Sequence, residues 1–343
     1  MTKPRIFLAH TPAMLAGYYG PRAVAALRDI AEVVVNPTGE HLDADALAVH
    51  ASGCAIIVSD RMTPGPASFF DQAPEDLVAF LRCAVDIRNV DVEAASRRGI
   101  LVTRATPGFA ASVAELGIGM MIDLARGVSA AAGSYRSGGA PAARMGRQLQ
   151  GSSMGIIGYG VIGQHLAMLA RAFGMTVLAY DPHKTIADTD VRQVPLERLL
   201  GEADFVVCLA VATPETENLM NAAAFARMRP HAYFINLARG NLVDEPALAA
   251  ALDAKHIAGA ALDVGRAPDQ MPTAELASRA DVVATPHIGG LTPSAVEHQA
   301  FDTVEQARAI FAGLDPQNAV NLEAAARFAR FRQSRGSESP PST

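Results

Sequence analysis

A glycine-rich hexapeptide is the first segment whose residue types and spacing could support chemistry, and it consists of Gly158, Tyr159, Gly160, Val161, Ile162 and Gly163. It lies between a short apolar run and an apolar stripe at helical spacing, which indicates a turn from a strand into a helix. In such a turn the first glycine permits the bend, the second lets the backbone approach a pyrophosphate, and the third allows close helix packing. The pattern indicates a dinucleotide site, with helix-start amides facing the phosphates.

An aspartate closes the next predicted strand, 18 residues after Gly163. The Asp181 carboxylate suits the ribose hydroxyls of NAD and would repel the 2′-phosphate of NADP, although His183 and Lys184 soften that repulsion. NAD is therefore the predicted cofactor. An ordinary Asp-Pro turn is the alternative role for Asp181. S-adenosylmethionine methyltransferases also combine a glycine turn with an acidic strand end, so residues further along the chain must decide.

Two later strands are each followed by a residue that could do chemistry. Arg239 could bind an anion, and His287 could move a proton. Arg239 follows an apolar strand, and its guanidinium can bind a carboxylate through two parallel hydrogen bonds. His287 follows another strand, and an imidazole that titrates near neutrality suits proton exchange with a hydroxyl. On the residues alone, Arg239 is equally well explained as a solvated residue at a helix start, and a histidine at a strand end is usually structural.

The composition describes a folded protein with room for two domains, since 343 residues are 50% hydrophobic and 19% charged. The formal net charge of −6 gives no basic stripe, which argues against nucleic acid as the main partner. Cys54, Cys83 and Cys208 lie in apolar stretches without metal-ligand spacing, so we expect buried thiols in a reducing compartment, no metal and no membrane anchor. The expected location is the cytoplasm.

Short apolar runs alternate with helical patterns, which predicts parallel sheets with crossover helices. The predicted strands of the larger sheet are residues 155–157, 176–180, 205–209, 233–236, 258–262 and 281–285. A second, smaller doubly wound domain is predicted from runs at residues 6–9, 33–35, 55–58, 80–83 and 100–102.

Two long helical patterns, at residues 110–126 and 294–311, flank the larger block of strands. We infer that the chain crosses twice between the domains. The predicted division is a substrate domain of residues 1–107 plus 292–331, an inserted domain of residues 108–291, and a flexible polar tail of residues 332–343.

Six motifs occur along the chain in a distinctive order. They are Ser112-Val-Ala-Glu, the glycine hexapeptide, Thr213-Pro-Glu-Thr, Asn236-Leu-Ala-Arg-Gly, Ala261-Leu-Asp-Val and Thr285-Pro-His-Ile-Gly-Gly. Their order and spacing resemble the D-isomer-specific 2-hydroxyacid dehydrogenases over roughly residues 75–315. The resemblance implies an α/β fold in which a Rossmann NAD-binding domain is inserted into a smaller flavodoxin-like substrate domain. It also implies a homodimer that transfers a hydride between nicotinamide and C2 of a small 2-hydroxy or 2-oxo acid.

The same resemblance implies roles for individual residues. Arg239 would orient the substrate carboxylate, and His287 would act in acid-base chemistry. Thr213 would lie beside the dinucleotide, which is compatible with its alternative role as a helix N-cap. The other implied cofactor contacts are Leu237, Ala238, Asp263 and Gly289. For Asp263 the implied contact is to the nicotinamide, and the alternative role is a buried carboxylate in a turn.

One departure from the family pattern lies behind the histidine. The family places a glutamate where this chain has Pro268, and that glutamate hydrogen-bonds the catalytic histidine. A one-residue insertion makes Asp269 our predicted substitute. Gln270 is the alternative, because formate dehydrogenases of this family use a glutamine there. In a third alternative both belong to a surface loop.

The substrate loop also departs from the family, which binds the substrate carboxylate with amides of a glycine-rich loop. Here Ala84 and Asp86 replace glycines, and Val85 and Asp86 are the predicted substrate-loop residues. Arg88 either adds a second anion contact or pairs with a neighbouring aspartate. The sequence of this loop does not identify which 2-hydroxy acid is the substrate.

A second class of function stays open at this point. The C-terminal binding proteins resemble this family in fold and residues yet act as NAD(H)-sensing corepressors, and the missing glutamate favours them. The presence of Arg239 and His287 favours the enzyme, so the prediction is an NAD-dependent oxidoreductase. A methyltransferase is the third and weakest alternative.

Overall fold

Two compact units make up the protein, and the computed structural model describes residues 3–336. One unit combines residues 1–108 with 293–343, and the other comprises residues 109–292. The chain therefore passes between the units twice, as the two long helical patterns predict. Within residues 3–336, no helix combines the length and apolar character that crossing a membrane requires.

The first unit is a five-stranded parallel sheet in the order β2-β1-β3-β4-β5, the order of flavodoxin-like folds. Each predicted strand is present within a residue or two of its expected bounds. The elements are β1 (Arg5–Leu8), α1 (Pro12–Tyr18), α2 (Pro21–Ile30), β2 (Glu32–Val35), α3 (Ala44–His50), β3 (Ile56–Ser59), α4 (Ala67–Asp71), β4 (Ala79–Arg82), α5 (Val92–Arg97), β5 (Leu101–Arg104), α13 (Pro293–Phe311), η4 (Leu322–Ala324) and α14 (Ala326–Gly336).

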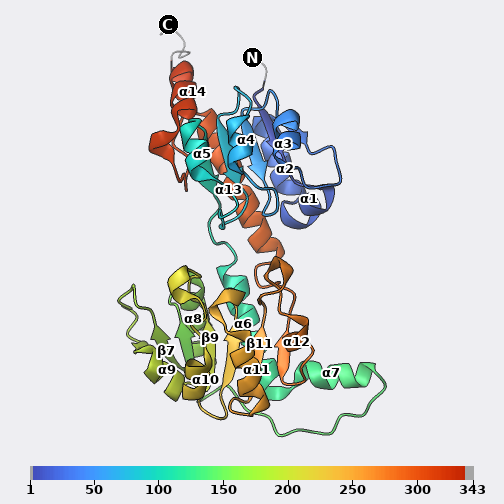
Figure 1. The fold of residues 1–343 in the computed structure, drawn as a ribbon, viewed down its shortest axis with the longest axis vertical. Coiled ribbons are helices and arrows are strands. Elements are labelled where there is room, and N and C mark those ends of the chain that lie inside the picture. Colours follow the sequence, from blue (N-terminus) through green and yellow to red (C-terminus); the bar gives the residue numbers. More distant parts are fainter. Residues whose placement is uncertain (1–2, 337–343) are drawn as a thin grey trace. The chain divides into compact units, whose positions relative to one another are not determined.

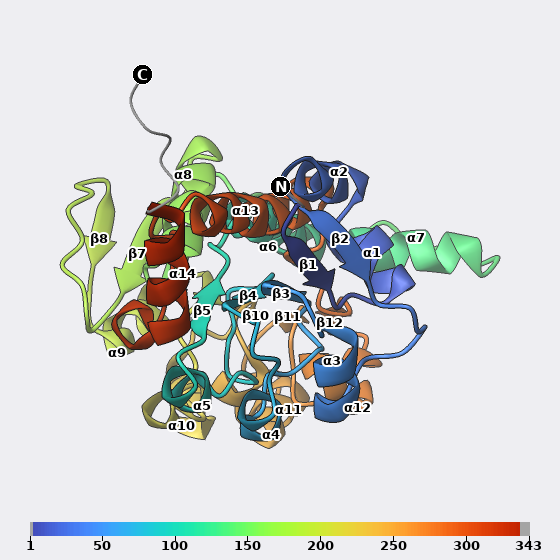
Figure 2. The same cartoon turned by 90° about the horizontal axis from the view of Figure 1, so that it is seen from above.

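Helices cover both faces of this sheet, with α2, α13 and α14 on one side and α3, α4 and α5 on the other (Figure 2). Successive side chains of a strand point to opposite faces, so each strand contributes to two cores. Ile6 and Leu8 lie in the core beneath α2 and α13, whereas Phe7 packs beneath α3 and α4. The near-continuous apolar strands of the sequence follow from this burial on both faces.

The second unit is a seven-stranded parallel sheet in the order β12-β11-β10-β9-β6-β7-β8. The chain reverses its direction of winding between β6 and β9, which creates a switch point. The elements are α6 (Ala110–Arg126), α7 (Val128–Arg136), β6 (Ser153–Ile157), α8 (Val161–Ala172), β7 (Thr176–Tyr180), β8 (Val191–Gln193), α9 (Leu196–Glu202), β9 (Phe205–Cys208), η1 (Pro214–Thr216), α10 (Ala222–Arg227), β10 (Tyr233–Asn236), η2 (Gly240–Leu242), α11 (Glu245–Asp253), β11 (Gly259–Leu262), η3 (Pro268–Gln270), α12 (Ala274–Ala277) and β12 (Val282–Ala284).

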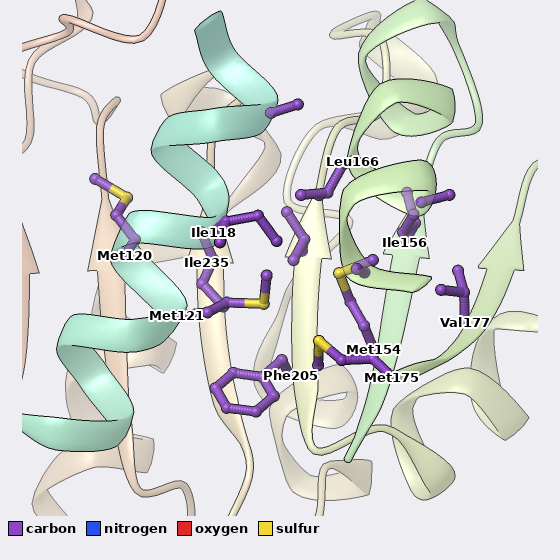
Figure 3. Packing of buried hydrophobic residues seen from close by; sticks show 14 of the residues in the cluster. Ile118, Met120, Met121, Met154, Ile156, Leu166, Met175, Val177, Phe205 and Ile235 are labelled. Atoms are coloured by element: carbon purple, nitrogen blue, oxygen red, sulfur yellow. The ribbon is translucent and has the colours of Figure 1, made fainter. Parts of the chain in front are cut away.

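The predicted fold class is confirmed, with one added strand. The edge strand β8 spans three residues, of which only Val191 is buried, so it carries no readable periodicity. On one face of the sheet, Ile118 and Met121 of α6 and Leu166 of α8 pack against the strands (Figure 3). Helices α9, α10, α11 and α12 supply the core of the other face.

Helix α7 extends away from the rest of its own unit (Figure 1). None of its residues is buried, and Val128 and Tyr135 are 54% and 67% exposed. Met145, in the segment that follows, is 96% exposed. An arm with large apolar side chains in solvent is typical of a surface that another protein covers.

The predicted tail needs a correction at its start. Helix α14 continues to Gly336, so residues 332–336 are helical rather than a flexible tail. Phe328 is buried and Phe331 packs on Phe311 with ring centroids 6.4 Å apart, which ties this helix to the core. Residues 337–343 of the predicted tail lie outside the described residues.

A buried histidine follows β1 at the carboxyl edge of the five-stranded sheet. His10 is 2% exposed, and neither ring nitrogen has a hydrogen-bond partner among the described residues. Its ring packs edge-on against Tyr19, with centroids 4.9 Å apart. Burial lowers the pKa of His10 to about 4, because the apolar surroundings disfavour the charged form, while nearby Asp60 opposes this shift.

Burial of this uncharged imidazole predicts acid-sensitive stability. The unfolded chain binds a proton at His10 near an ordinary pKa of 6.5, whereas the folded chain binds it only near pH 4. The free energy of unfolding should fall as pH decreases from about 6.5 to about 4, by on the order of 3 kcal/mol. Chemical denaturation at several pH values measures this fall. The slope of the free energy of unfolding against pH reports how many protons unfolding takes up, and His10→Gln should lower that number by about one.

The control is His183→Gln, which removes an exposed histidine and should retain the parent's pH dependence. If His10→Gln also retains it, the neutral buried imidazole is not the source of the acid sensitivity.

Candidate active site

The predicted site residues of the second unit lie along one edge of its sheet. All strands are parallel, so their carboxyl ends share an edge, in the order β7, β6, β9, β10, β11 and β12. The residues that follow these strands are, in the same order, Asp181, Gly158, Thr213, Arg239, Asp263 and His287. Ligands of doubly wound sheets bind at this edge beside the switch point.

The three motif glycines meet three different constraints. Gly158 has φ +93°, and a Cβ there would lie 2.7 Å from the Ala210 backbone. A Cβ on Gly163 would lie 2.8 Å from the Gly158 carbonyl oxygen, so only glycine lets α8 approach the turn. A Cβ on Gly160 would meet nothing within 4 Å. Gly160 also begins α8 without a side-chain cap, which leaves an open backbone surface that fits a pyrophosphate.

The Asp181 carboxylate lies beside this turn. It accepts hydrogen bonds from the amides of Tyr159 at 3.0 Å and His183 at 2.9 Å. A carboxylate has about four acceptor positions, so capacity remains for ribose hydroxyls. Lys184 reaches back to the Tyr159 carbonyl oxygen at 3.4 Å. The residues present therefore fit the adenosine half of a dinucleotide.

Thr213 is the N-cap residue before the short helix η1, which agrees with its alternative role in the sequence prediction. The Thr213 amide donates to Thr216 Oγ1 at 2.8 Å. This cap orders the loop after β9, the strand next to the glycine turn. A contact from Thr213 to the dinucleotide stays a prediction.

Arg239 follows β10 in a segment that Asn236 organises. The Asn236 amide group donates to the Arg239 carbonyl oxygen at 3.0 Å and accepts from the Ala238 amide at 3.1 Å. Leu237 and Ala238 are buried, which anchors the segment on the apolar side. Sequence reasoning missed this role of Asn236, although a lone polar residue closing an apolar strand was a usable signal.

Asp263 organises the loop that carries His287. Its carboxylate is 3% exposed and accepts from Thr285 Oγ1 at 2.7 Å and from the amides of Ile288 and Gly289, each at 2.8 Å. The His287 amide donates to the Asp263 carbonyl oxygen at 3.0 Å. The predicted nicotinamide contact of Asp263 stays a prediction, and these contacts agree with its alternative role as a buried carboxylate in a turn.

These contacts support an unusual backbone at His287, which has φ +54°. A residue other than glycine in this left-handed region of backbone conformation raises the free energy of the folded state, and such strain often occurs at functional sites. A Cβ on Gly289 would lie 2.9 Å from Asp263 Oδ2, so glycine is required for the carboxylate to reach the loop amides.

The segment expected to hold the partner of His287 forms the short helix η3. Gln270 has φ +56°, and its Oε1 is buried without a hydrogen-bond partner among the described residues. The side chain of Asp269 lies outside the described residues. The identity of the partner therefore stays a prediction.

The predicted substrate loop follows β4 in the first unit. Arg88 pairs with Asp86 through Nε–Oδ1 at 3.0 Å and Nη2–Oδ2 at 2.6 Å, so the structure supports pairing with a neighbouring aspartate. This pairing offsets the negative charge that Asp86 brings to the loop. Within residues 3–336, the amides of Ala84 and Val85 have no hydrogen-bond acceptor.

The glycine turn at a switch point, with an acidic residue at the end of the next strand, defines a dinucleotide-binding α/β protein. Residues 118–289 match the family model for the D-isomer specific 2-hydroxyacid dehydrogenase, NAD binding domain, and the chain belongs to this family. The family prediction is confirmed.

Relatives span several substrates. The chain is 38% identical over 255 residues to D-3-phosphoglycerate dehydrogenase of Synechocystis sp., covering 73% of this chain and 46% of that protein, so it spans about half of that relative. It is 36% identical over 275 residues to hydroxypyruvate reductase of Thermotoga maritima, covering 78% and 89%. It also matches the structure of an NADPH-dependent glyoxylate/hydroxypyruvate reductase from Sinorhizobium meliloti at a TM-score of 0.78 and 25% identity, covering 93% of this chain and 98% of that one.

The Asp263 contacts predict a local loss of order in a variant. Asp263→Asn replaces one acceptor oxygen by an NH2 group that faces donors. Amide exchange of residues 285–289, measured by mass spectrometry, should rise by about tenfold or more, since a hydrogen bond to a charged group contributes roughly 1.5–3 kcal/mol.

Asp281→Asn is the matched control, because Asp281 pairs with Arg279 at the amino end of β12, away from this loop. It should leave exchange of residues 285–289 unchanged. Equal exchange in Asp263→Asn and the parent would contradict the role assigned to this carboxylate.

Proposed function

We propose that this protein is an NAD-dependent oxidoreductase of small 2-hydroxy and 2-oxo acids. The observation that carries the proposal is the placement of Arg239, Asp263 and His287 after three adjacent strands, on the edge that holds the glycine turn. Family membership supports it. When bound, the nicotinamide would supply or accept a hydride at C2 of the acid.

Arg239 would bind the substrate carboxylate and polarise the adjacent carbonyl. Its guanidinium is always charged and matches the planar carboxylate with paired donors. Positive charge beside the C2 oxygen stabilises the negative charge that develops there during reduction. The Asn236 hydrogen bonds fix the backbone from which this side chain extends.

His287 would donate a proton to the C2 oxygen during reduction and accept it back during oxidation. Reduction thus requires the imidazolium, and oxidation the neutral ring. The Asp263 hydrogen bonds would place the histidine at a defined position along the edge. In the first unit, the loop at Val85 and Asp86 would contact the substrate carboxylate. The Val85 amide, which has no acceptor among the residues that the structure describes, supports this assignment.

The proposed cofactor is NAD rather than NADP. The Asp181 carboxylate beside the glycine turn supports this choice, because it favours hydroxyls and disfavours a 2′-phosphate. The remaining assigned cofactor contacts are Leu237, Ala238, Thr213, Asp263 and Gly289. Kinetics with both cofactors should give a higher kcat/KM with NADH than with NADPH.

We further propose a homodimer in the cytoplasm. The exposed apolar side chains of α7 and its following segment support a partner surface, and the proposed partner is a second copy of this chain. Three free, buried cysteines agree with a reducing compartment.

The test of the proposed function is NADH oxidation with a panel of 2-oxo acids, followed by absorbance. The panel contains glyoxylate, hydroxypyruvate, pyruvate, and bulkier and phosphorylated acids. At least one should be reduced, and His287→Gln should lower kcat by about 10²–10⁴, the usual contribution of a general acid. His50→Gln, in α3 of the first unit, should retain parent kcat.

NADH binding without turnover of any acid would contradict the enzyme proposal. That outcome would favour an NAD(H)-sensing interaction protein, for which the proline at position 268 is the supporting feature. Binding of S-adenosylmethionine but not NADH would favour a methyltransferase instead.

We propose Asp269 as the partner of His287, with Gln270 as the alternative. A carboxylate stabilises the imidazolium form more than an amide does, so reduction persists to higher pH. Asp269→Asn should move the alkaline limb of kcat/KM for reduction to lower pH, while Gln270→Ala should leave it in place. A shift confined to Gln270→Ala would transfer the role to the glutamine.

A further inference from the structure

Arg82, the last residue of β4, has a buried guanidinium that bonds four backbone carbonyls. Nη2 donates to the Arg61 oxygen at 2.6 Å, and Nη1 donates to the oxygens of Thr63 at 3.2 Å and of Asp60. Nε donates to the Asp86 oxygen at 3.1 Å. The side chain is 2% exposed. One cation thus joins the loop after β3 to the loop after β4.

Burying a cation here is costly, which argues that the residue does more than fill space. Desolvation opposes the charged form, and an apolar side chain of similar volume often stabilises such a site better. A planar fork of five donors suits four surrounding acceptors, whereas lysine offers three donors from one atom. The position therefore uses the particular geometry of arginine.

The bonded carbonyls determine how the loop after β4 is oriented. The Ala84 oxygen accepts from the Ala105 amide at 3.1 Å, and the Asp86 oxygen accepts from Arg82. In a trans peptide, the N–H points opposite to the C=O. The Ala84 oxygen and the Val85 N–H belong to the same peptide, so the bond from Ala105 points this N–H away from β5. The next peptide, between Val85 and Asp86, lies between that peptide and the one whose oxygen Arg82 bonds.

We propose that Arg82 is a positioning residue for the substrate, which fixes the backbone of Val85 and Asp86 so that this loop can bind the carboxylate of a 2-oxo acid. The inference rests on the proposed function. Arg82 acts through the loop and does not itself touch the substrate. Arg88 supports the same conformation by bonding the Asp86 carboxylate.

The same unit contains a matched control. Arg327 is 7% exposed, and its Nη1 donates to the carbonyl oxygens of Pro74, Glu75 and Leu77 at 2.6, 3.3 and 3.2 Å. These carbonyls precede β4, whereas the Arg82 contacts follow β3 and β4. Both arginines bond backbone carbonyls, but only Arg82 bonds the proposed substrate loop.

The experiment compares Arg82→Lys with Arg327→Lys. Steady-state kinetics of the reduced 2-oxo acid should show KM raised about tenfold or more in Arg82→Lys, with kcat within about threefold of the parent and KM for NADH unchanged. Arg327→Lys should lower thermal stability while changing the KM of the acid less than about threefold. If Arg82→Lys does not fold, Arg82→Met takes its place in the comparison, because methionine removes the buried charge and has a similar side-chain volume.

Amide exchange of residues 60–63 and 84–90 provides a readout that needs no activity. It should rise in the Arg82 variant and stay at the parent level in Arg327→Lys. If the parent reduces a 2-oxo acid and both variants have the same KM, the positioning role is wrong while the proposed function stands. If the parent reduces no acid, the proposed function fails, and parent-like exchange in the Arg82 variant would then reject the loop-fixing role as well.

Discussion

Parallel strand pairing is the constraint on which the rest of this structure depends. It sends the carboxyl ends of β7, β6, β10, β11 and β12 to one edge, although the residues after them are spread over more than a hundred positions of sequence. The resulting order runs from Asp181 and the glycine turn at one end to His287 at the other. Such an order matches an extended dinucleotide whose nicotinamide ring would reach Arg239 and His287.

Buried polar side chains then orient the loops that leave these edges. Asn236 bonds the segment before Arg239, Asp263 bonds the loop of His287, and Arg82 bonds two loops of the first unit. Each forms hydrogen bonds with backbone groups of its loop, which links local stability to the placement of functional atoms. The proposed chemistry therefore depends on residues that need not touch the ligands.

Much of this arrangement is predictable from local pattern. Apolar runs located nearly all strands, because both faces of each sheet are covered, and the glycine spacing identified the turn with the required φ at Gly158. The edge strand β8 was missed because three residues carry no period. The tail predicted to begin at residue 332 instead continues α14 to Gly336, next to Phe331, which packs on Phe311 of a helix distant in sequence. A buried carboxylate in a turn was the alternative role for Asp263, but its partners could not be named because they lie 22 to 26 residues away and depend on strand pairing.

Direct transfer of a hydride to C2 is the central claim, and isotopic labelling tests it most directly. NADH carrying deuterium at the transferable C4 position is incubated with the reduced 2-oxo acid, and the product is examined by nuclear magnetic resonance. We expect one deuterium at C2 of a 2-hydroxy acid, in the D configuration wherever C2 is a stereocentre. Product without deuterium at C2 from fully labelled NADH, or deuterated product of L configuration, would contradict it.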